Sequence, residues 1–78
     1  MKGASSVLLD MIDERRRQDA QWGGPEHDDT HSSDDWFKYI SYQIDRARYD
    51  TDKRSRLIKI AALATAAVES FDRINGEA

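Results

Sequence analysis

The chain contains no cysteine and a single proline. Without cysteine, the protein can form no disulfide bond, no thiolate metal site and no thiol nucleophile. It also has no glycine-rich phosphate loop, and none of its serines lies in a nucleophile-elbow sequence. We therefore expect no catalytic residues, although an enzymatic activity stays open as an alternative.

Long apolar runs and an excess of positive charge are also missing. No stretch approaches the roughly 18 apolar residues of a membrane span, and residues 1–6 lack the apolar core of a signal peptide. The formal net charge is −3, whereas non-specific binding to DNA needs a basic excess. We expect a cytoplasmic protein that does not contact a membrane and does not bind DNA directly.

The chain is short for an independently stable fold. A domain of 78 residues buries only about 60% of the surface that its unfolded chain exposes. Small domains of this kind need a staple or a partner, and cysteine is not available as a staple. We expect residues 1–78 to form a single helical domain that assembles as a homo-oligomer.

The apolar spacing predicts an all-α fold. Three helices are expected, at about residues 6–22, 33–49 and 53–75. An acidic loop, 23–32, opens with Gly-Gly-Pro, which ends the first helix. Ser32 and Asp35 have the spacing of a capping box at the start of the second helix. Because the next connection is short, the last two helices should form an antiparallel hairpin.

Each predicted helix has an apolar face that should contribute to the core. In the first two helices these faces comprise Val7, Leu8, Met11 and Ile12, and then Trp36, Phe37, Ile40, Ile44 and Ala47. Between Leu57 and Val68 the third helix is apolar almost all round, which is typical of a central helix packed on more than one side.

The apolar face of the first helix becomes polar halfway along. Its continuation at 100° per residue passes through Arg15, Gln18, Asp19 and Trp22. These groups either leave the core and are solvated, or they enter a pocket or interface with Trp22 as its apolar wall. Periodicity alone does not decide between the two interpretations.

The second helix carries an aromatic face roughly opposite its core face, comprising Tyr39, Tyr42, Arg46 and Tyr49. Such a face is compatible with amphipathic surface tyrosines, with a subunit interface or with base stacking. Several arginines of the chain, Arg15 and Arg46 among them, could also hold phosphate groups through their forked donors, or form ion pairs between and within helices.

The acidic loop gathers potential metal ligands close together in sequence, namely His27, Asp28, Asp29 and His31. Carboxylates with imidazole suit magnesium, manganese or zinc. The spacing matches no established metal motif, however, and an Asp- and Ser-containing loop before a helix more often serves capping or partner binding. A loop histidine acting as general base is a weaker alternative.

The run from Glu14 to Gly23, Glu-Arg-Arg-Arg-Gln-Asp-Ala-Gln-Trp-Gly, followed by His27, resembles the opening of small phage and actinobacterial MazG-like proteins. The segments 60–62 and 68–73 resemble the last helix of the same group. This resemblance implies an all-α oligomer, and MazG-like pyrophosphohydrolases use magnesium to cleave nucleoside triphosphates. It also implies a phage or prophage origin.

The resemblance does not extend to the catalytic glutamates of that family. Its metal-binding positions fall on Tyr39, Ile40, Gln43, Arg56 and Lys59. None of these can replace a magnesium carboxylate, and the last two would repel a divalent cation. The resemblance therefore implies the helical scaffold and a nucleotide-facing groove without the hydrolase activity.

We therefore expect a non-catalytic phage-type binding protein without a cofactor, whose ligand is a host protein or a nucleotide signal. The predicted binding residues are Arg15, Gln18, Trp22, His27, Asp28, Tyr39, Tyr42 and Arg46. One alternative is a divergent nucleotide pyrophosphohydrolase with magnesium at the His27–His31 cluster. The other is a structural or accessory phage protein.

Overall fold

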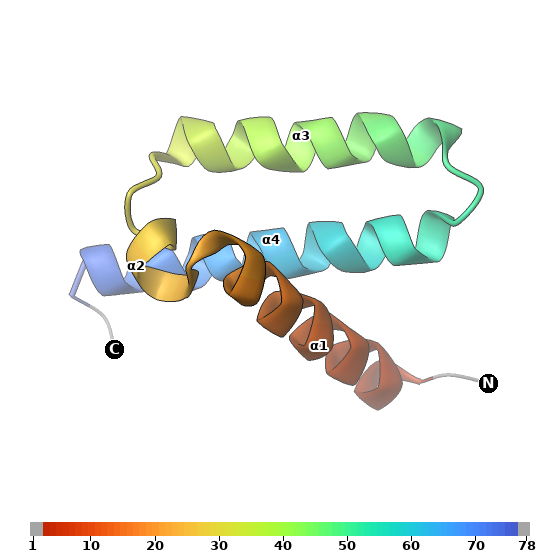
Figure 1. Cartoon of the computed structure of the whole chain (residues 1–78), viewed down its shortest axis with the longest axis horizontal. Coiled ribbons are helices and arrows are strands. Elements are labelled where there is room, and N and C mark those ends of the chain that lie inside the picture. Colours follow the sequence, from red (N-terminus) through yellow and green to blue (C-terminus); the bar gives the residue numbers. More distant parts are fainter. Residues whose placement is uncertain (1–2, 77–78) are drawn as a thin grey trace.

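The computed structural model describes residues 3–76. Its helices are α1 (Ala4–Trp22), α2 (Gly24–Asp28), α3 (Ser33–Tyr49) and α4 (Lys53–Ile74), and no strand occurs among the described residues. α3 and α4 lie side by side and run antiparallel, while α1 crosses α4 obliquely (Figure 1). The predicted all-α class and the packing of the last two helices are confirmed.

The prediction of a continuous loop over 23–32 is wrong, because a short helix, α2, occupies its first half. Gly23 ends α1 in the left-handed conformation, with φ 109°, and its N–H bonds to the carbonyl of Asp19. Gly24 also has a positive φ, 68°. Pro25 then lies in the first turn of α2, where its missing N–H costs no hydrogen bond. The Gly-Gly-Pro sequence thus joins two helices at a sharp angle.

The capping box at the start of α3 is present as the sequence predicts. The hydroxyl of Ser32 accepts a hydrogen bond from the backbone N–H of Asp35 at 3.2 Å. The Asp35 carboxylate accepts one from the backbone N–H of Ser32 at 2.9 Å. Because both orphan donors of the first turn are satisfied, α3 begins at a defined residue, which places the next side chain, Trp36, in the interior.

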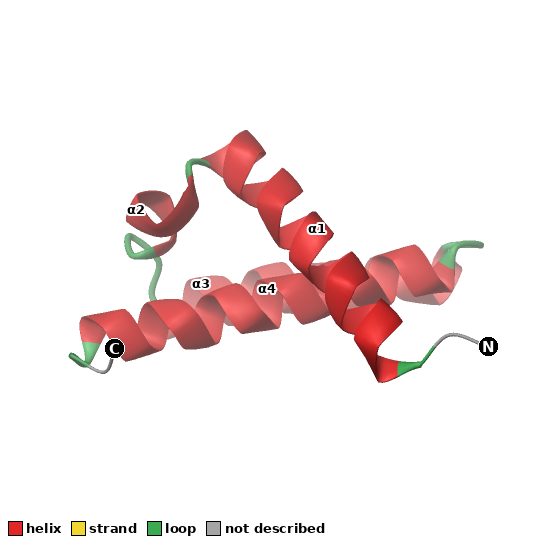
Figure 2. Ribbon diagram, turned by 90° about the horizontal axis from the view of Figure 1, so that it is seen from below, coloured by secondary structure: helices red, strands yellow, loops and turns green. Residues whose placement is uncertain are grey.

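α4 is the central helix, as its apolar composition predicts, because α1, α2 and α3 all pack against it. Ala62, Ala66 and Ser70 are buried and follow one another at four-residue spacing. Their small side chains let the neighbouring helices approach closely. α1 and α3 do not pack against each other; seen from below, α1 crosses α4 obliquely while α3 runs along the far side of α4 (Figure 2). A valley floored by α4 therefore separates them.

Much of the predicted core is exposed in the single chain. Phe37 is 63% exposed although it neighbours buried Trp36, and Ile44 is 41% exposed. On α1, Leu8 is 54% and Ile12 41% exposed. The reason is geometric: α1 and α3 each have only α4 as a long neighbour, so each buries a narrow stripe. Within residues 3–76, no helix combines the length and apolarity needed to cross a bilayer.

Candidate ligand-binding pocket

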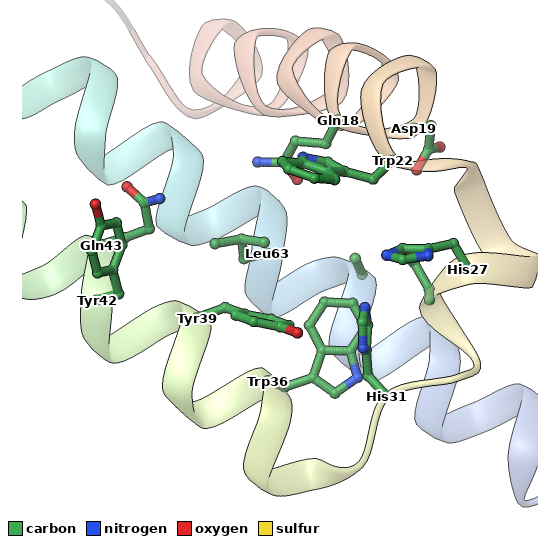
Figure 3. Close-up of a pocket in the computed structure, with 12 residues that line it drawn as sticks. Gln18, Asp19, Trp22, His27, His31, Trp36, Tyr39, Tyr42, Gln43 and Leu63 are labelled. Atoms are coloured by element: carbon green, nitrogen blue, oxygen red, sulfur yellow. The ribbon is translucent and has the colours of Figure 1, made fainter.

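A cavity of about 420 Å³ fills the valley between α1 and α3 (Figure 3). Its walls come from all the helices: Gln18, Asp19 and Trp22 of α1, His27 and Asp28 of α2, Trp36, Tyr39, Tyr42 and Gln43 of α3, and Leu63 and Ala66 of α4, together with His31. α2 closes one end of the valley, so the Gly-Gly-Pro junction is the local feature that brings its side chains to the site.

Aromatic and imidazole side chains make up half of the lining residues. The ring of His31 lies at the centre of a cluster, with its centroid 4.8 Å from that of His27, 5.1 Å from Trp36 and 5.2 Å from Tyr39, each in an edge-to-face arrangement. Trp22 faces this cluster from α1, on the opposite side of the cavity (Figure 3). Edge-to-face packing fixes the orientation of each ring. The result is an ordered wall of flat surfaces.

One carboxylate among the lining residues has an oxygen without a hydrogen-bond partner. Asp28 is only 8% exposed, and its Oδ2 atom is buried without a hydrogen bond. Its own backbone carbonyl accepts hydrogen bonds from the backbone N–H of His31 at 3.1 Å and from the hydroxyl of Ser70 at 3.4 Å. The backbone of Asp28 is therefore fixed, while its Oδ2 atom is left without a hydrogen-bond partner. Buried acceptors in native proteins are normally satisfied.

The electrostatic environment opposes ionisation of Asp28. Burial raises the pKa of its carboxyl above the usual range, and the neighbouring Asp19 carboxylate raises that pKa further. Arg15, Arg73 and His31 act in the opposite direction with smaller effects. No described lysine or arginine lines the cavity. The site is consequently suited to a neutral or cationic group that carries hydrogen-bond donors.

The structure brings most of the predicted binding residues together. Gln18, Trp22, His27, Asp28, Tyr39 and Tyr42 all line the cavity. Arg15 and Arg46 do not belong to its lining. Arg15 instead donates a hydrogen bond to Glu69 of α4 at 2.8 Å, and its Nε atom is buried without a partner. It holds α1 on α4 at the level of the site.

Arg46 lies just outside the cavity, on the ring of Tyr42. Its guanidinium carbon is 5.7 Å from the ring centroid, and its Nη1 atom donates to the Tyr42 hydroxyl at 3.3 Å. Tyr42 also lines a second, more open hollow together with Arg46 and Tyr49. Tyr42 is thus shared between the two hollows, and Arg46 is a cation in direct contact with this lining residue.

The candidate metal ligands of the 27–31 segment serve different purposes. Asp29 is bound by Arg73 at 2.8 Å and accepts a hydrogen bond from Ser70 at 2.8 Å. These bonds lower the pKa of the Asp29 carboxyl. His27 and His31 pack against each other edge to face. Among residues 3–76, no three His, Asp or Glu side chains are placed to share a metal ion.

Sequence reasoning missed part of the lining. Trp36 was assigned to the core opposite the tyrosines, whereas Trp36, Tyr39 and Gln43 face the same cavity. Their spacing of three and then four residues is the signal that could have placed them on one face of α3. Leu63 and Ala66 were assigned to helix packing alone, because nothing in the sequence tells which part of a central helix stays uncovered.

The chain matches no protein-family model, no curated protein and no solved structure in the three comparisons made.

Proposed function

We propose that the protein is a non-catalytic binding protein for the base of a nucleoside or nucleotide. The observation that carries this proposal is the cavity itself, in which rings from α1, α2 and α3 surround a buried acceptor. Stacking on an aromatic side chain contributes about 1–3 kcal/mol per base. Polar side chains of the lining, Gln18 and Gln43 among them, would supply the contacts that orient a base within such a site.

The charge distribution supports a particular orientation of the ligand. Since the described lining holds carboxylates and no lysine or arginine, phosphate groups are disfavoured inside the cavity. The base enters, and the phosphates stay at the rim. Arg46, stacked on Tyr42 at that rim, is the residue that would meet them. In this orientation Arg46 would contact the phosphate groups and Trp22 would stack on the base.

The positions that the MazG-like resemblance marks for metal glutamates support a non-catalytic role. Arg56 donates a hydrogen bond to Gln43 at 2.7 Å and is ion-paired with Asp50 at 2.8 Å. A guanidinium thus lies where a magnesium site would require a carboxylate. This local chemistry disfavours the pyrophosphohydrolase alternative and leaves the helical scaffold as a binding surface.

A host protein as ligand receives less support from the 26–35 segment. The carboxylates of Asp29 and Asp35 are already engaged within the chain, by Arg73 and by the backbone of Ser32. An acidic surface that recognises a basic partner needs carboxylates that are free to pair with it. The phage origin and the inhibition of a host process remain parts of the proposal that rest on the resemblance alone.

The test is isothermal titration calorimetry with the four common ribonucleosides and their monophosphates, with and without EDTA. Trp22 is 59% exposed, so Trp22→Ala should leave the fold intact while weakening binding about 10- to 100-fold through the lost stacking. Tyr49→Ala, at an 89% exposed ring outside the cavity, is the matched control. Absence of binding by every ligand, or release of phosphate during the titration, would contradict the proposal.

We further propose that the chain forms a homo-oligomer. Exposed large apolar side chains occur on every long helix, and those outside the cavity include Leu8, Leu9, Leu57, Phe71 and Ile74. Soluble monomers rarely expose large contiguous apolar patches, and such patches mark interaction sites. A second copy supplies a matching apolar surface without any further component.

A further inference from the structure

The α3–α4 hairpin has one face that no described helix covers. α2 and the second half of α1 lie on one side of the layer that α3 and α4 form, and the other side is bare (Figure 2). The cavity lies between α1 and α3 on the covered side. The bare side, which we call the back face, is therefore turned away from the cavity.

The contacts of α4 show which of its residues belong to the back face. α1 is ion-paired with Arg54 and Glu69, Ser70 bonds to Asp29 at the end of α2, and Arg56 bonds to α3. At about 100° per residue, these contacts leave one arc of the helix free, roughly opposite Ser70. The arc carries a stripe with alternating spacings of four and three residues, comprising Leu57, Ala61, Ala64, Val68 and Phe71.

The stripe on α4 is apolar and largely open to solvent. Leu57 is 58% exposed, and Val68 and Phe71 are each 60% exposed. α3 contributes Phe37 and Ile44 to the same face, because both lie about 150° around that helix from the tyrosines that line the cavity. No residue of the stripe is charged. An exposed apolar surface of this extent marks an interaction site.

The two ends of the hairpin carry opposite charge, which indicates what covers the back face. Around the turn, residues 45–56 contain five Lys or Arg and three Asp. At the other end, residues 32–38 and 69–73 together contain four Asp or Glu and two Lys or Arg. A second copy placed face to face by a twofold axis can run parallel or antiparallel to the first. Only the antiparallel copy brings the basic end of each hairpin onto the acidic end of the other.

We infer that the back face is the subunit interface of an antiparallel homodimer, in which two hairpins stack as a four-helix bundle and both cavities face outward. This inference rests on the proposed homo-oligomer and adds its interface and symmetry. In this arrangement α4 packs on α4 of the second copy, and Leu57 of one copy meets Phe71 of the other. Ala64, midway between them, meets its own equivalent at the twofold axis, where a small side chain permits close approach of the helices.

The first turns of α1 flank the same interface. They pass the edge of α4 and extend to the back-face side of the hairpin layer (Figure 2). Leu8 and Leu9 are exposed there. They lie where the second copy would cover them, so the dimer accounts for exposed apolar groups on all three long helices.

The first experiment cross-links the dimer at its axis. The chain has no cysteine, so Ala64→Cys introduces a single thiol. Helices that pack about 8–10 Å apart bring facing Cα atoms within reach of a disulfide. Ala20→Cys, at an exposed alanine of α1 outside the stripe, is the matched control. Under mild oxidation, Ala64→Cys should form covalent dimer at least about 10-fold faster, because the thiols are held at millimolar effective concentration.

The second experiment places a charge in the interface. A twofold interface contains every substitution twice, so Val68→Glu would bury two carboxylates and should raise the dissociation constant by about 100-fold. Val68 is exposed in the single chain, so the substitution should leave the fold of each subunit intact. Ala20→Glu introduces the same charge elsewhere. Sedimentation velocity measures the dissociation constants, and far-UV circular dichroism checks helix content.

The outcomes separate the interface from the oligomer. A wild-type dimer that Val68→Glu leaves associated would overturn the back face as interface, while the homo-oligomer would stand. A dimer that Val68→Glu dissociates but Ala64→Cys does not cross-link would overturn the antiparallel arrangement. If the wild-type protein is a monomer at high concentration, both proposals fall together. Dissociation by Val68→Glu with rapid cross-linking by Ala64→Cys, and neither effect in the Ala20 variants, supports both.

Discussion

The two ends of the α3–α4 hairpin treat their polar groups in opposite ways. At the turn end, around residues 50–56, Lys53 donates to the backbone carbonyls of Ala47, Arg48 and Asp50, at 3.1 to 3.2 Å. There, Arg56 holds the carboxylate of Asp50. At the pocket end, around residues 22–36, the Oδ2 atom of the Asp28 carboxylate is buried without a hydrogen-bond partner.

The pKa of an aspartate carboxyl therefore shifts in opposite directions at the two ends. The Arg56 guanidinium and the backbone N–H of Asp52 lower the pKa of the Asp50 carboxyl, whereas burial raises that of Asp28. A fully paired carboxylate stabilises the fold, and an unpaired buried one weakens it. Groups that break the usual rules of hydrogen bonding and packing concentrate at functional sites. The contrast supports the proposal that the pocket end binds the ligand and that the turn end is structural.

The largest effect should come from removing the apolar anchor of the pocket end. Trp36 is 7% exposed, so Trp36→Ala leaves a cavity and should lower the free energy of unfolding by about 3–5 kcal/mol. Tyr49, at the turn end of the same helix, is 89% exposed, and Tyr49→Ala should change it by less than about 0.5 kcal/mol. Urea denaturation measures both. A similar loss of unfolding free energy in both variants would contradict the proposed difference between the two ends.

A second effect concerns the exposed apolar residues on the first turns of α1, which lie outside the cavity. Leu8 is 54% and Leu9 63% exposed, and Asp10 beside them is ion-paired with Arg54 at the turn end. Leu8→Glu with Leu9→Glu would place carboxylates in a subunit contact, so the dissociation constant should rise about 100-fold. Sedimentation velocity measures this, with Trp22→Ala as control. A wild-type monomer at high concentration would disprove the oligomer.

The smallest effect has opposite signs at the two ends. Since the pKa of Asp28 is raised in the folded state, its ionisation penalises the fold; the penalty is absent below the ordinary value of 3.8 and grows as the pH rises to the folded pKa. Asp28→Asn should therefore increase the free energy of unfolding at pH 7, by on the order of 1 kcal/mol.

Asp50→Asn should do the reverse. The lowered pKa of Asp50 contributes stability that is present above its ordinary value of 3.8 and is lost as the pH falls through the folded pKa. Denaturation curves between pH 3 and pH 7 give the difference between each variant and the wild type. Differences of the same sign in the two variants would show that the ends are energetically alike.

The elements of the fold were largely predictable because their signals are local. Helix periodicity, the Ser32–Asp35 capping box and the stop at Gly23 each depend on neighbours within four residues. α2 was missed because Gly-Gly-Pro normally ends a helix, and its second role, starting another helix at Gly24, depends on where the chain turns next. Phe37 is exposed because α1 packs against α4 and not against α3, and the sequence near Phe37 carries no signal of that arrangement.

The site was predictable where one helix face carries it and unpredictable where helices meet. The polar continuation of α1 identified Gln18 and Trp22, and the tyrosine face of α3 identified Tyr39. The ion pair of Arg15 with Glu69 was not predictable, because its partner lies 54 residues away in sequence. The missing hydrogen-bond partner of Asp28 Oδ2 was not predictable, because the neighbours of a buried atom are known only once the chain is folded.

The positions of the two tryptophans have a practical consequence. The chain contains only Trp22 and Trp36, and both line the cavity. Trp22 is largely exposed and Trp36 almost fully buried, so the indoles should emit at different wavelengths. All tryptophan fluorescence therefore comes from residues that line the pocket. Intrinsic fluorescence would report occupancy directly, with Trp22→Phe and Trp36→Phe assigning the signal to each wall, and no label would be required.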